Sequence, residues 1–308
     1  MLTVSKIGSF SDDMHAGMLR TMTPKGLAKP TIAIVGAGSL GSALAVALRA
    51  AGYPLSEIVS RAGDASRRRA RYLARRVGAR ATVLGQGEIR ASIVWLCVPD
   101  REIRGCAESL ARTKNWSKRI VLHSSGALGS EQLRALRRWG AAVASLHPLM
   151  TFVPGVAPSL RGVPFAVEGD RTAERVARQV ARDLGGATFV IHERDKAAYH
   201  AWGAFASPLL LAALVTAERV AGAAGIPPTA ARTMMLPIIR QTLANYAEHG
   251  PEGAFSGPII RGDAATLEKH LRILRRVPEA REVYLALARS AVKNLPGKNK
   301  KQVRKMLA

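Results

Sequence analysis

Short apolar runs typical of buried strands alternate with longer amphipathic stretches typical of helices along the first two thirds of the chain. The first run, Ile32 to Val35, is followed by three glycines and by a buried helical stretch from Ala43 to Leu48. Further strands are expected within residues 57–60, 81–84, 92–99, 119–126, 142–146, 162–170 and 187–191, with helices at 131–138 and 172–184. This alternation predicts an α/β fold, a Rossmann-type doubly wound and mostly parallel sheet over residues 30–192.

The pattern changes past Glu193, where strand-like runs stop and Ala- and Leu-rich helical stretches take over. These helices are expected at residues 195–224, 228–249, 263–276 and 278–295. Glycine and proline at 225–228 and 250–251 separate them, and Pro208 is expected to kink the first. We therefore expect an all-α domain over residues 193–295. A basic tail, 296–308, follows it, and residues 1–29 are expected to be disordered or to precede the true start.

The three glycines after the first strand, Gly36, Gly38 and Gly41, have GxGxxG spacing. The first allows a tight turn, the second lets a pyrophosphate approach the backbone, and the third lets helix and strand pack closely. Free N–H groups at the start of the helix then receive the phosphates. The residues expected to bind a dinucleotide here are Gly36, Ala37, Gly38, Ser39, Leu40 and Gly41. The alternative is a glycine-rich turn without a ligand.

The end of the second strand indicates which dinucleotide is bound. Proteins that bind NAD place an acidic residue there to accept the ribose 2′-hydroxyl. This chain has Ser60 and Arg61 instead, with Arg67 to Arg69 just beyond. A guanidinium and a hydroxyl suit a 2′-phosphate, so the sequence favours NADP over NAD. The alternative is that these are ordinary surface arginines.

Two further strand ends are expected near the nicotinamide, because ligands of open α/β sheets bind at the carboxyl ends of strands. Val98 and Pro99 follow one strand, and His123, Ser124 and Ser125 follow the next. We expect Val98, Pro99 and Ser124 to contact the cofactor and His123 and Ser125 to be catalytic. The alternative for the serines and histidine is a structural loop cap.

The first C-terminal helix carries Lys196, His200, Gly203 and Ser207 at spacings that place them on one face. His200 is the best single catalytic candidate, because an imidazole can be charged or neutral near pH 7. A histidine bonded to a backbone carbonyl is the alternative. Lys196 is the second catalytic candidate on this face, and Ser207 is expected to contact substrate.

Two loops add candidate substrate ligands. His147 precedes Pro148, where it contacts substrate or fixes a turn. In the segment 257–263, Asp263 is expected to cap the next helix. Arg261, held near glycines, is expected to clamp a carboxylate or phosphate of the substrate.

Charge and composition narrow the function classes. Lys and Arg number 46 against 22 Asp and Glu, a net charge of +24, which suits a nucleic-acid binder or a protein that attracts anions. The arginines are spread along helices and aromatic residues make up only 5%, so we favour solvated helix faces over nucleic-acid binding. No His, Cys, Asp or Glu cluster has metal-ligand spacing.

The apolar residues bear on location and assembly. Two cysteines suggest no disulfide framework, and the sequence predicts no apolar segment long enough to span a bilayer, so we expect a cytoplasmic protein without membrane contact. The helices past residue 193 are very apolar, which favours a homodimer formed through the helical domain. Larger burial within one chain is the alternative.

Several motifs occurring together resemble those of one bacterial family. They are Gly36 to Gly41, Val98-Pro99-Asp100, His123 to Gly126, His147-Pro148 with Thr151-Phe152, Tyr199-His200, Gly257 to Asp263, and His270-Leu271. The family combines a Rossmann-like domain with a C-terminal domain of unknown function. Its members are labelled NADP oxidoreductases of the deazaflavin-dependent type, distantly similar to pyrroline-5-carboxylate reductase and the 6-phosphogluconate dehydrogenase clan.

The resemblance implies a fold and a cofactor, NADP, but no substrate. In the related clan a lysine on the equivalent helix acts as the acid, a role that the position of Lys196 allows. One departure is Ser207-Pro208, where the family pattern has Ser-Asn, so an amide that could contact substrate or nicotinamide is missing.

Together these observations predict an NADP-dependent oxidoreductase that acts on a small anionic substrate in a cleft between the two domains. The alternative from another class is an NADP(H)-binding sensor or regulatory protein without turnover, which the missing amide would suit.

Overall fold

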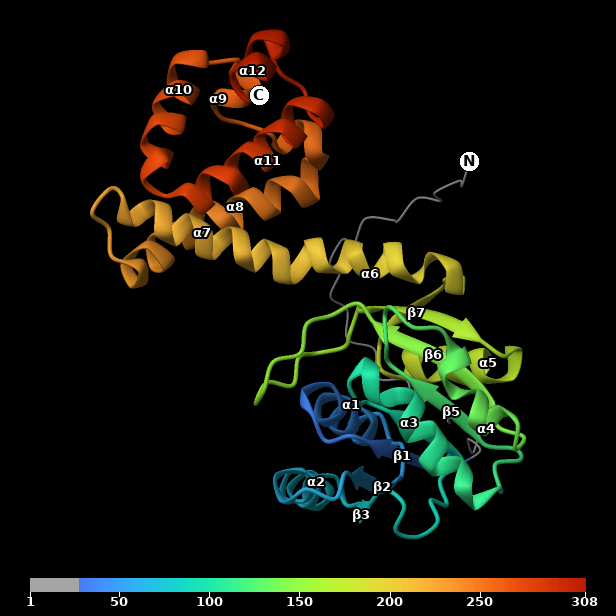
Figure 1. Ribbon diagram of the computed structural model, residues 1–308. Helices are drawn as coiled ribbons and strands as arrows, with labels where there is room; N and C mark the ends of the chain where they lie inside the picture. Colours follow the sequence, from blue (N-terminus) through green and yellow to red (C-terminus); the bar gives the residue numbers. More distant parts are fainter. Residues whose placement is uncertain (1–27) are drawn as a thin grey trace, which may run out of the picture. The chain divides into compact units, whose positions relative to one another are not determined.

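The computed structural model describes residues 28–308 and contains an eight-stranded sheet with the order β3-β2-β1-β4-β5-β6-β7-β8 (Figure 1). The strands are β1 (Ile32–Val35), β2 (Leu55–Ser60), β3 (Arg80–Val83), β4 (Ile93–Leu96), β5 (Ile120–His123), β6 (Ala142–Pro148), β7 (Pro164–Gly169) and β8 (Ala187–Val190). The expectation for residues 1–29 falls almost wholly outside the described range.

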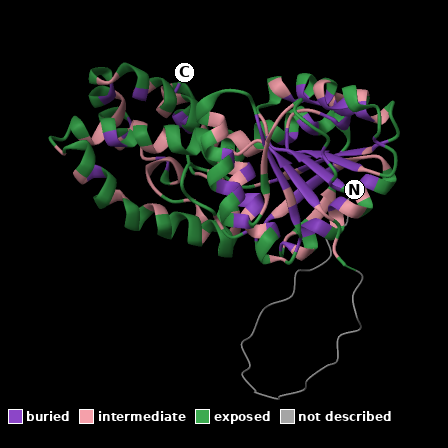
Figure 2. Ribbon diagram, turned by 90° about the horizontal axis from the view of Figure 1, so that it is seen from below, coloured by how far each residue is buried: buried purple, intermediate pink, exposed green. Residues whose placement is uncertain are grey.

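Parallel pairing dominates the sheet, as predicted. β1 pairs in parallel with both β2 and β4, β2 with β3, β4 with β5, and β7 with β8, whereas β6 and β7 are antiparallel. The central strands β1 and β4 are buried on both faces, which explains why they read as continuous apolar runs rather than alternating ones. Figure 2 shows the strands as the most buried part of the chain.

Helices connect the strands. They are α1 (Ser39–Ala50), α2 (Asp64–Val77), α3 (Asp100–Leu110), α4 (Arg134–Arg137) and α5 (Arg171–Asp183). α1 packs against α2, α3 packs against α4, and α5 covers β7 and β8. The buried small residues of these helices, such as Ala43, Ala107 and Ala177, let helix and sheet approach closely.

The chain divides into two compact units, which are described separately below. The first comprises the described residues up to His123 together with 133–143 and 152–161. The second comprises 124–132, 144–151 and 162–308, and so holds most of β6, all of β7 and β8, and the helices that follow. This division does not follow the change of composition at residue 192, and the domain boundaries expected from composition stay predictions.

The second unit is helical beyond β8. Its helices are α6 (Lys196–Ala204), α7 (Leu210–Gly222), α8 (Pro228–Ala254), α9 (Pro258–Arg261), α10 (Ala264–Ile273), α11 (Pro278–Asn294) and α12 (Lys300–Met306). A π-helical turn, Phe205–Leu209, contains Pro208 and joins α6 to α7. Proline lacks an N–H, and the wider turn accommodates the lost hydrogen bond. Gly250 leaves the helical conformation within α8 at φ 69°, at the break predicted there.

Part of the basic tail expected at residues 296–308 is a packed helix. Val303 and Leu307 of the α12 segment are each 1% exposed and join a core cluster with Leu267, Ala288 and Val292. Arg289 donates hydrogen bonds to the backbone oxygens of the last two residues. The apolar positions inside the basic run therefore anchor a helix within the expected tail.

The expectation about membrane-spanning segments also needs correction. The continuous helical stretch Glu193–Gly222 is long and apolar enough to cross a bilayer by length and composition, and only 6% of its most apolar window is buried. Length and composition alone are weak evidence for a membrane segment. Most of the apolar residues of this helix are exposed in the described structure.

Candidate functional site

The glycine loop has a distinct geometry at each of its three glycines. A Cβ on Gly36, whose φ is +104°, would lie 2.4 Å from the carbonyl oxygen of Cys97, and one on Gly41 would lie 1.9 Å from that of Gly36. A Cβ on Gly38 would meet nothing within 4 Å. Gly36 and Gly41 are thus fixed by packing, whereas the backbone at Gly38 is open to a ligand.

The start of α1 offers hydrogen-bond donors beside that opening. Gly38 occupies the N-cap position in extended conformation, and no side-chain cap is formed there. The first N–H groups of a helix have no partner within the helix and attract anions. This backbone geometry suits the binding of a phosphate.

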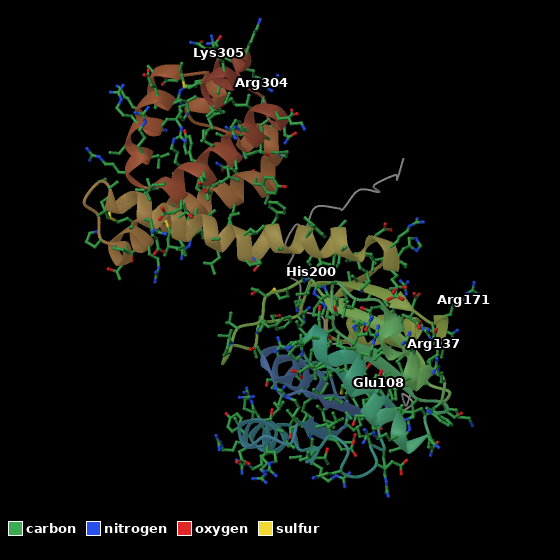
Figure 3. The ribbon with its side chains drawn as sticks, in the orientation of Figure 1. Glu108, Arg137, Arg171, His200, Arg304 and Lys305 are labelled. Carbon is green, nitrogen blue, oxygen red and sulfur yellow. The ribbon has the colours of Figure 1, made fainter. Side chains whose placement is uncertain are left out.

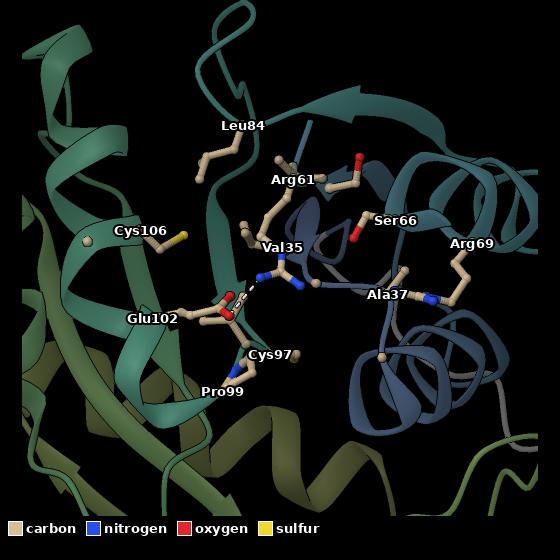
Figure 4. A pocket seen from close by; sticks show the side chains of 16 residues that line it. Val35, Ala37, Arg61, Ser66, Arg69, Leu84, Cys97, Pro99, Glu102 and Cys106 are labelled. Carbon is tan, nitrogen blue, oxygen red and sulfur yellow. Dashed lines mark hydrogen bonds and ion pairs between the residues drawn. The ribbon is translucent and has the colours of Figure 1, made fainter. Parts of the chain in front are cut away.

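A cavity of about 560 Å³ opens beside the loop within the first unit (Figure 4). Its wall includes seven of the predicted cofactor ligands: Gly36, Ala37, Gly38, Ser60, Arg61, Val98 and Pro99. Strand ends β1, β2 and β4 bring these residues together because parallel strands end at the same edge of the sheet. Ser60 also donates a hydrogen bond to the Thr82 carbonyl (3.3 Å), which holds its hydroxyl at the end of β2.

The remaining predicted cofactor ligands are not in this wall. Ser39 lines an adjoining cavity of about 670 Å³ formed from α1, α2 and residues 154–157. Leu40 and Gly41 belong to the first turn of α1, where Gly41 packs under the loop. Ser124 is buried and lies in the second unit.

Arg69, one of the arginines noted just beyond the second strand, also lines this wall, and sequence reasoning missed Ser66, Leu84, Glu102, Gly105 and Cys106. Glu102 is the most informative of them. The Arg61 Nη1 donates to Glu102 Oε1 at 2.7 Å, so a carboxylate from α3 meets the guanidinium at the end of β2 (Figure 4). Burial, assisted by the charge of Glu102, raises the pKa of the Cys106 thiol to about 12, which keeps this cysteine protonated.

A second polar cluster lies in the second unit around a buried lysine. Lys196 is fully buried, and its Nζ donates to Ser145 Oγ at 2.8 Å. Ser145 in turn donates to the carbonyl oxygen of Ser125 at 3.1 Å. Lys196 therefore lies beneath the surface, and through Ser145 on β6 it holds the loop that follows β5.

His147 and Tyr199 form the closest side-chain pair of this cluster. His147 Nδ1 lies 2.6 Å from Tyr199 Oη, and the rings meet edge to face. Burial is the main cause that lowers the pKa of His147 to about 4, and the charges of Lys196 and His200 act in the same direction. Burial raises the pKa of Tyr199 to about 12. Both side chains are therefore neutral at pH 7.

His147 and His200 converge on the backbone of Gly126. A Cβ there would lie 2.9 Å from His147 Nε2 and 3.0 Å from His200 Cδ2, so only glycine leaves room for both rings. His200 itself is exposed (Figure 3), whereas Tyr199 is only 6% exposed. The His-Ser-Ser-Gly motif thus has a packing reason at its glycine.

The other predicted site residues differ in burial and in their hydrogen bonds. His123 is fully buried at the end of β5, and Ser125 Oγ accepts from the N–H groups of Ala127 and Leu128, a loop cap. Ser207 and Arg261 are exposed. Asp263 caps α10 as expected, since it accepts from the Thr266 N–H at 3.0 Å. The catalytic and substrate roles of these residues stay predictions.

Metal ligation finds no support in residues 28–308. Groups of three or more His, Cys, Asp or Glu side chains suited to a metal ion do not occur there. Within the same range Cys97 and Cys106 form no disulfide bond, and both are buried.

Comparison with known families identifies the two parts of the chain. Residues 21–148 match the Rossmann-like domain, and residues 163–291 match the family described as a domain of unknown function, DUF2520. The protein therefore joins a Rossmann-like domain to a DUF2520 domain, which confirms the resemblance found in the sequence. No curated protein sequence matches the chain.

Solved structures share this fold over most of their length. A Bacteroides fragilis protein described as an NADP oxidoreductase is 23% identical, with a TM-score of 0.72 and coverage of 85% of this chain and 97% of that chain. A Thermotoga maritima protein is 25% identical, with a TM-score of 0.66 and coverage of 84% and 95%. A reductive aminase from Aspergillus terreus, solved with NADPH and ethyl-5-oxohexanoate, is 14% identical, with a TM-score of 0.60 and coverage of 91% and 100%.

Two glycine variants separate the packing role of the loop from its ligand role. Gly41→Ala should lower the free energy of unfolding by about 3 kcal/mol, because the new methyl group overlaps the Gly36 carbonyl. Gly38→Ala should leave it within about 0.5 kcal/mol of wild type, yet weaken dinucleotide binding about tenfold or more by blocking the approach to the N–H groups. Thermal unfolding and NADPH titration of both variants measure this. Equal destabilisation by the two substitutions would contradict the assignment.

The His147 pKa predicts how stability depends on pH. Its folded value, about 4, lies below the ordinary value of 6.5, so the unfolded chain binds the proton more tightly. The contribution is present above pH 6.5 and is lost as the pH falls towards 4, by up to about 3 kcal/mol. Denaturant unfolding between pH 7 and 4 should show this slope in wild type and a smaller one in His147→Gln. The exposed His192→Gln should keep the wild-type slope.

Proposed function

We propose that the protein is an NADP-dependent oxidoreductase acting on a small anionic substrate that contains a carbonyl or imine group. The observation that carries the proposal is the open backbone at Gly38, which leads into a cavity whose wall holds Ser60, Arg61 and Arg69. A backbone cradle for a pyrophosphate followed by guanidinium groups at the end of β2 suits a dinucleotide with a 2′-phosphate.

The residues present fit NADP. The N–H groups at the start of α1 would receive the pyrophosphate, and Arg61, Ser66 and Arg69 would receive the 2′-phosphate. Leu84 and Gly105 offer apolar and flat wall for the adenine. When bound, the nicotinamide exchanges a hydride with a carbon of the substrate.

His147 and Tyr199 would supply the proton that accompanies hydride transfer. The neutral pair carries one O–H and one N–H, of which one hydrogen occupies the 2.6 Å bond. If Tyr199 donates to Nδ1, the imidazole of His147 carries its own hydrogen on Nε2. His147 is the less buried member of the pair. His147 Nε2 would pass its proton to the substrate's oxygen or nitrogen while Nδ1 takes the proton of Tyr199, and solvent would then reprotonate the phenolate left on Tyr199. His200, the first catalytic candidate from the sequence, would contact the substrate from the exposed side.

Anionic substrates are favoured by the net charge of +24 and by Arg261, whose guanidinium is exposed at the end of α9. The reductive aminase with the same fold was solved with a keto ester, a carbonyl compound. The substrate cleft and the cytoplasmic location expected from the sequence stay predictions.

A nucleotide sensor without turnover is the second candidate. Pro208 favours it, because the family amide is missing and the helix is interrupted by the π turn there. Oxidation of NADPH in the presence of cyclic imines, keto acids or a metabolite extract would exclude the sensor. Binding of NADPH with no oxidation across such a panel would favour it.

Nucleotide titration tests the cofactor. Wild type should bind NADPH more tightly than NADH, and Arg61→Ala should weaken NADPH binding about tenfold through loss of a charge-assisted contact. Nicotinamide fluorescence measures both affinities. Arg171→Ala, an exposed arginine on α5 (Figure 3), is the matched control and should bind like wild type. Absence of binding by either nucleotide would refute the proposed function.

We further propose that the protein forms a homodimer through α6, α7 and α8. These helices expose large apolar side chains: Trp202, Phe205, Leu209, Leu210, Leu211, Val215, Met234, Leu236, Ile238, Leu243 and Tyr246. Monomeric proteins rarely expose contiguous apolar patches larger than a few hundred Å². A second copy offers the same apolar helices, and self-association in a closed pair is the commonest way to cover such a surface.

Sedimentation measures the assembly. Wild type should sediment as a dimer, and Phe205→Asp, at a side chain that is 69% exposed in one chain, should shift it to monomer. Tyr72→Asp, at an aromatic residue 62% exposed on α2, should leave the dimer intact. Flotation of wild type with lipid vesicles, together with a monomeric mass, would indicate instead that a bilayer covers these helices.

A further inference from the structure

We propose that Glu102 sets the choice between NADPH and NADH, by competing with the cofactor's 2′-phosphate for Arg61. The inference rests on the proposed function, because it concerns the same dinucleotide cavity. It assigns a specificity-determining role to a residue on α3, far in sequence from the strand end where such carboxylates are expected.

The contact that carries the inference is the ion pair across the cavity wall. Arg61 Nη1 and Glu102 Oε1 lie 2.7 Å apart, and the side chains are 62% and 22% exposed (Figure 4). Glu102 and Cys106, one turn further along α3, both line the cavity wall. The carboxylate therefore faces the space in which the ribose of a dinucleotide would lie.

The two charges have opposite preferences for the cofactor. An NAD-binding protein uses a carboxylate near the end of β2 to accept the ribose 2′-hydroxyl. Here β2 ends in Ser60 and Arg61, and α3 supplies the carboxylate instead. A guanidinium attracts the 2′-phosphate, whereas Glu102 repels it and occupies Arg61. The structure thus combines an NADP determinant and an NAD determinant in one salt bridge.

Ser66 and Arg69 offer further contacts through which the 2′-phosphate could displace Glu102 from Arg61. Both line the same cavity, and neither forms a hydrogen bond or ion pair with another described side chain. A phosphate bound to Ser66 and Arg69 would lie in the same cavity as Arg61. The guanidinium of Arg61 could then exchange the carboxylate of Glu102 for the phosphate. Surface ion pairs such as Arg61–Glu102 are weak, and the exchange is therefore accessible.

The experiment measures NADPH and NADH affinity by nicotinamide fluorescence at low and at moderate salt. The variants are Glu102→Gln, Arg61→Ala, the double variant of these two, and the control Glu108→Gln. Glu102→Gln should tighten NADPH binding about three- to tenfold at low salt, with little change for NADH. Arg61→Ala frees the carboxylate and should tighten NADH while it weakens NADPH. The double variant should lose that NADH gain. The effect of Glu102→Gln should shrink as salt screens the charges.

Glu108→Gln is the matched control, since it removes an exposed carboxylate from the same helix away from the cavity wall (Figure 3). It should bind both nucleotides like wild type. Unchanged or weaker NADPH binding by Glu102→Gln, or an equal gain by Glu108→Gln, would overturn the inference while leaving the proposed function intact. Failure of wild type to bind either nucleotide would overturn both. Thermal unfolding of each variant verifies that it is folded.

Discussion

The close approach of three backbone segments is the constraint on which the nucleotide site depends. Gly36 turns directly under the carbonyl of Cys97, and Gly41 lies under the carbonyl of Gly36, so β1, the loop and α1 are packed without side chains between them. This packing leaves Gly38 as the open position and points the first N–H groups of α1 at it. Parallel pairing of β1 with β2 and β4 then brings the ends of those strands to the same edge. The open backbone at Gly38 and the cavity wall beside it both follow from this packing of β1, the loop and α1.

A buried cation organises the second unit in a comparable way. Lys196 is covered completely and ties α6 to Ser145, which in turn holds the loop after β5. Its charge, together with burial, keeps His147 neutral, and a neutral imidazole can serve as a hydrogen-bond donor rather than as an acid with a fixed charge. Lys196 is buried and bonded to Ser145, and the direct acid role that the resemblance implied stays a prediction. The cluster is built from β6, α6 and the loop before Gly126.

The charges in the cavity wall differ from the charge of the chain as a whole, because Arg61 there is paired with Glu102. The chain carries a net charge of +24, which raises the local concentration of anions around it. At the cavity, however, the arginine at the end of β2 is paired with a carboxylate. General attraction of anions and the proposed discrimination between NADPH and NADH would therefore have separate origins, the first in the whole surface and the second in one ion pair.

The sequence by itself determined the order of strands and helices, the glycine loop and the change to a helical C-terminal part. These features follow from local rules, since apolar periodicity and glycine spacing act over a few residues. It also singled out seven residues that line one cavity wall, because parallel strand ends meet at the same edge of the sheet. Only the tertiary structure decided that α3 supplies Glu102, that Tyr199 meets His147, that Lys196 is buried while His200 is exposed, and that the basic C-terminal run packs through Val303. Each of these depends on residues from separate elements, whose burial and partners are set by packing rather than by local sequence.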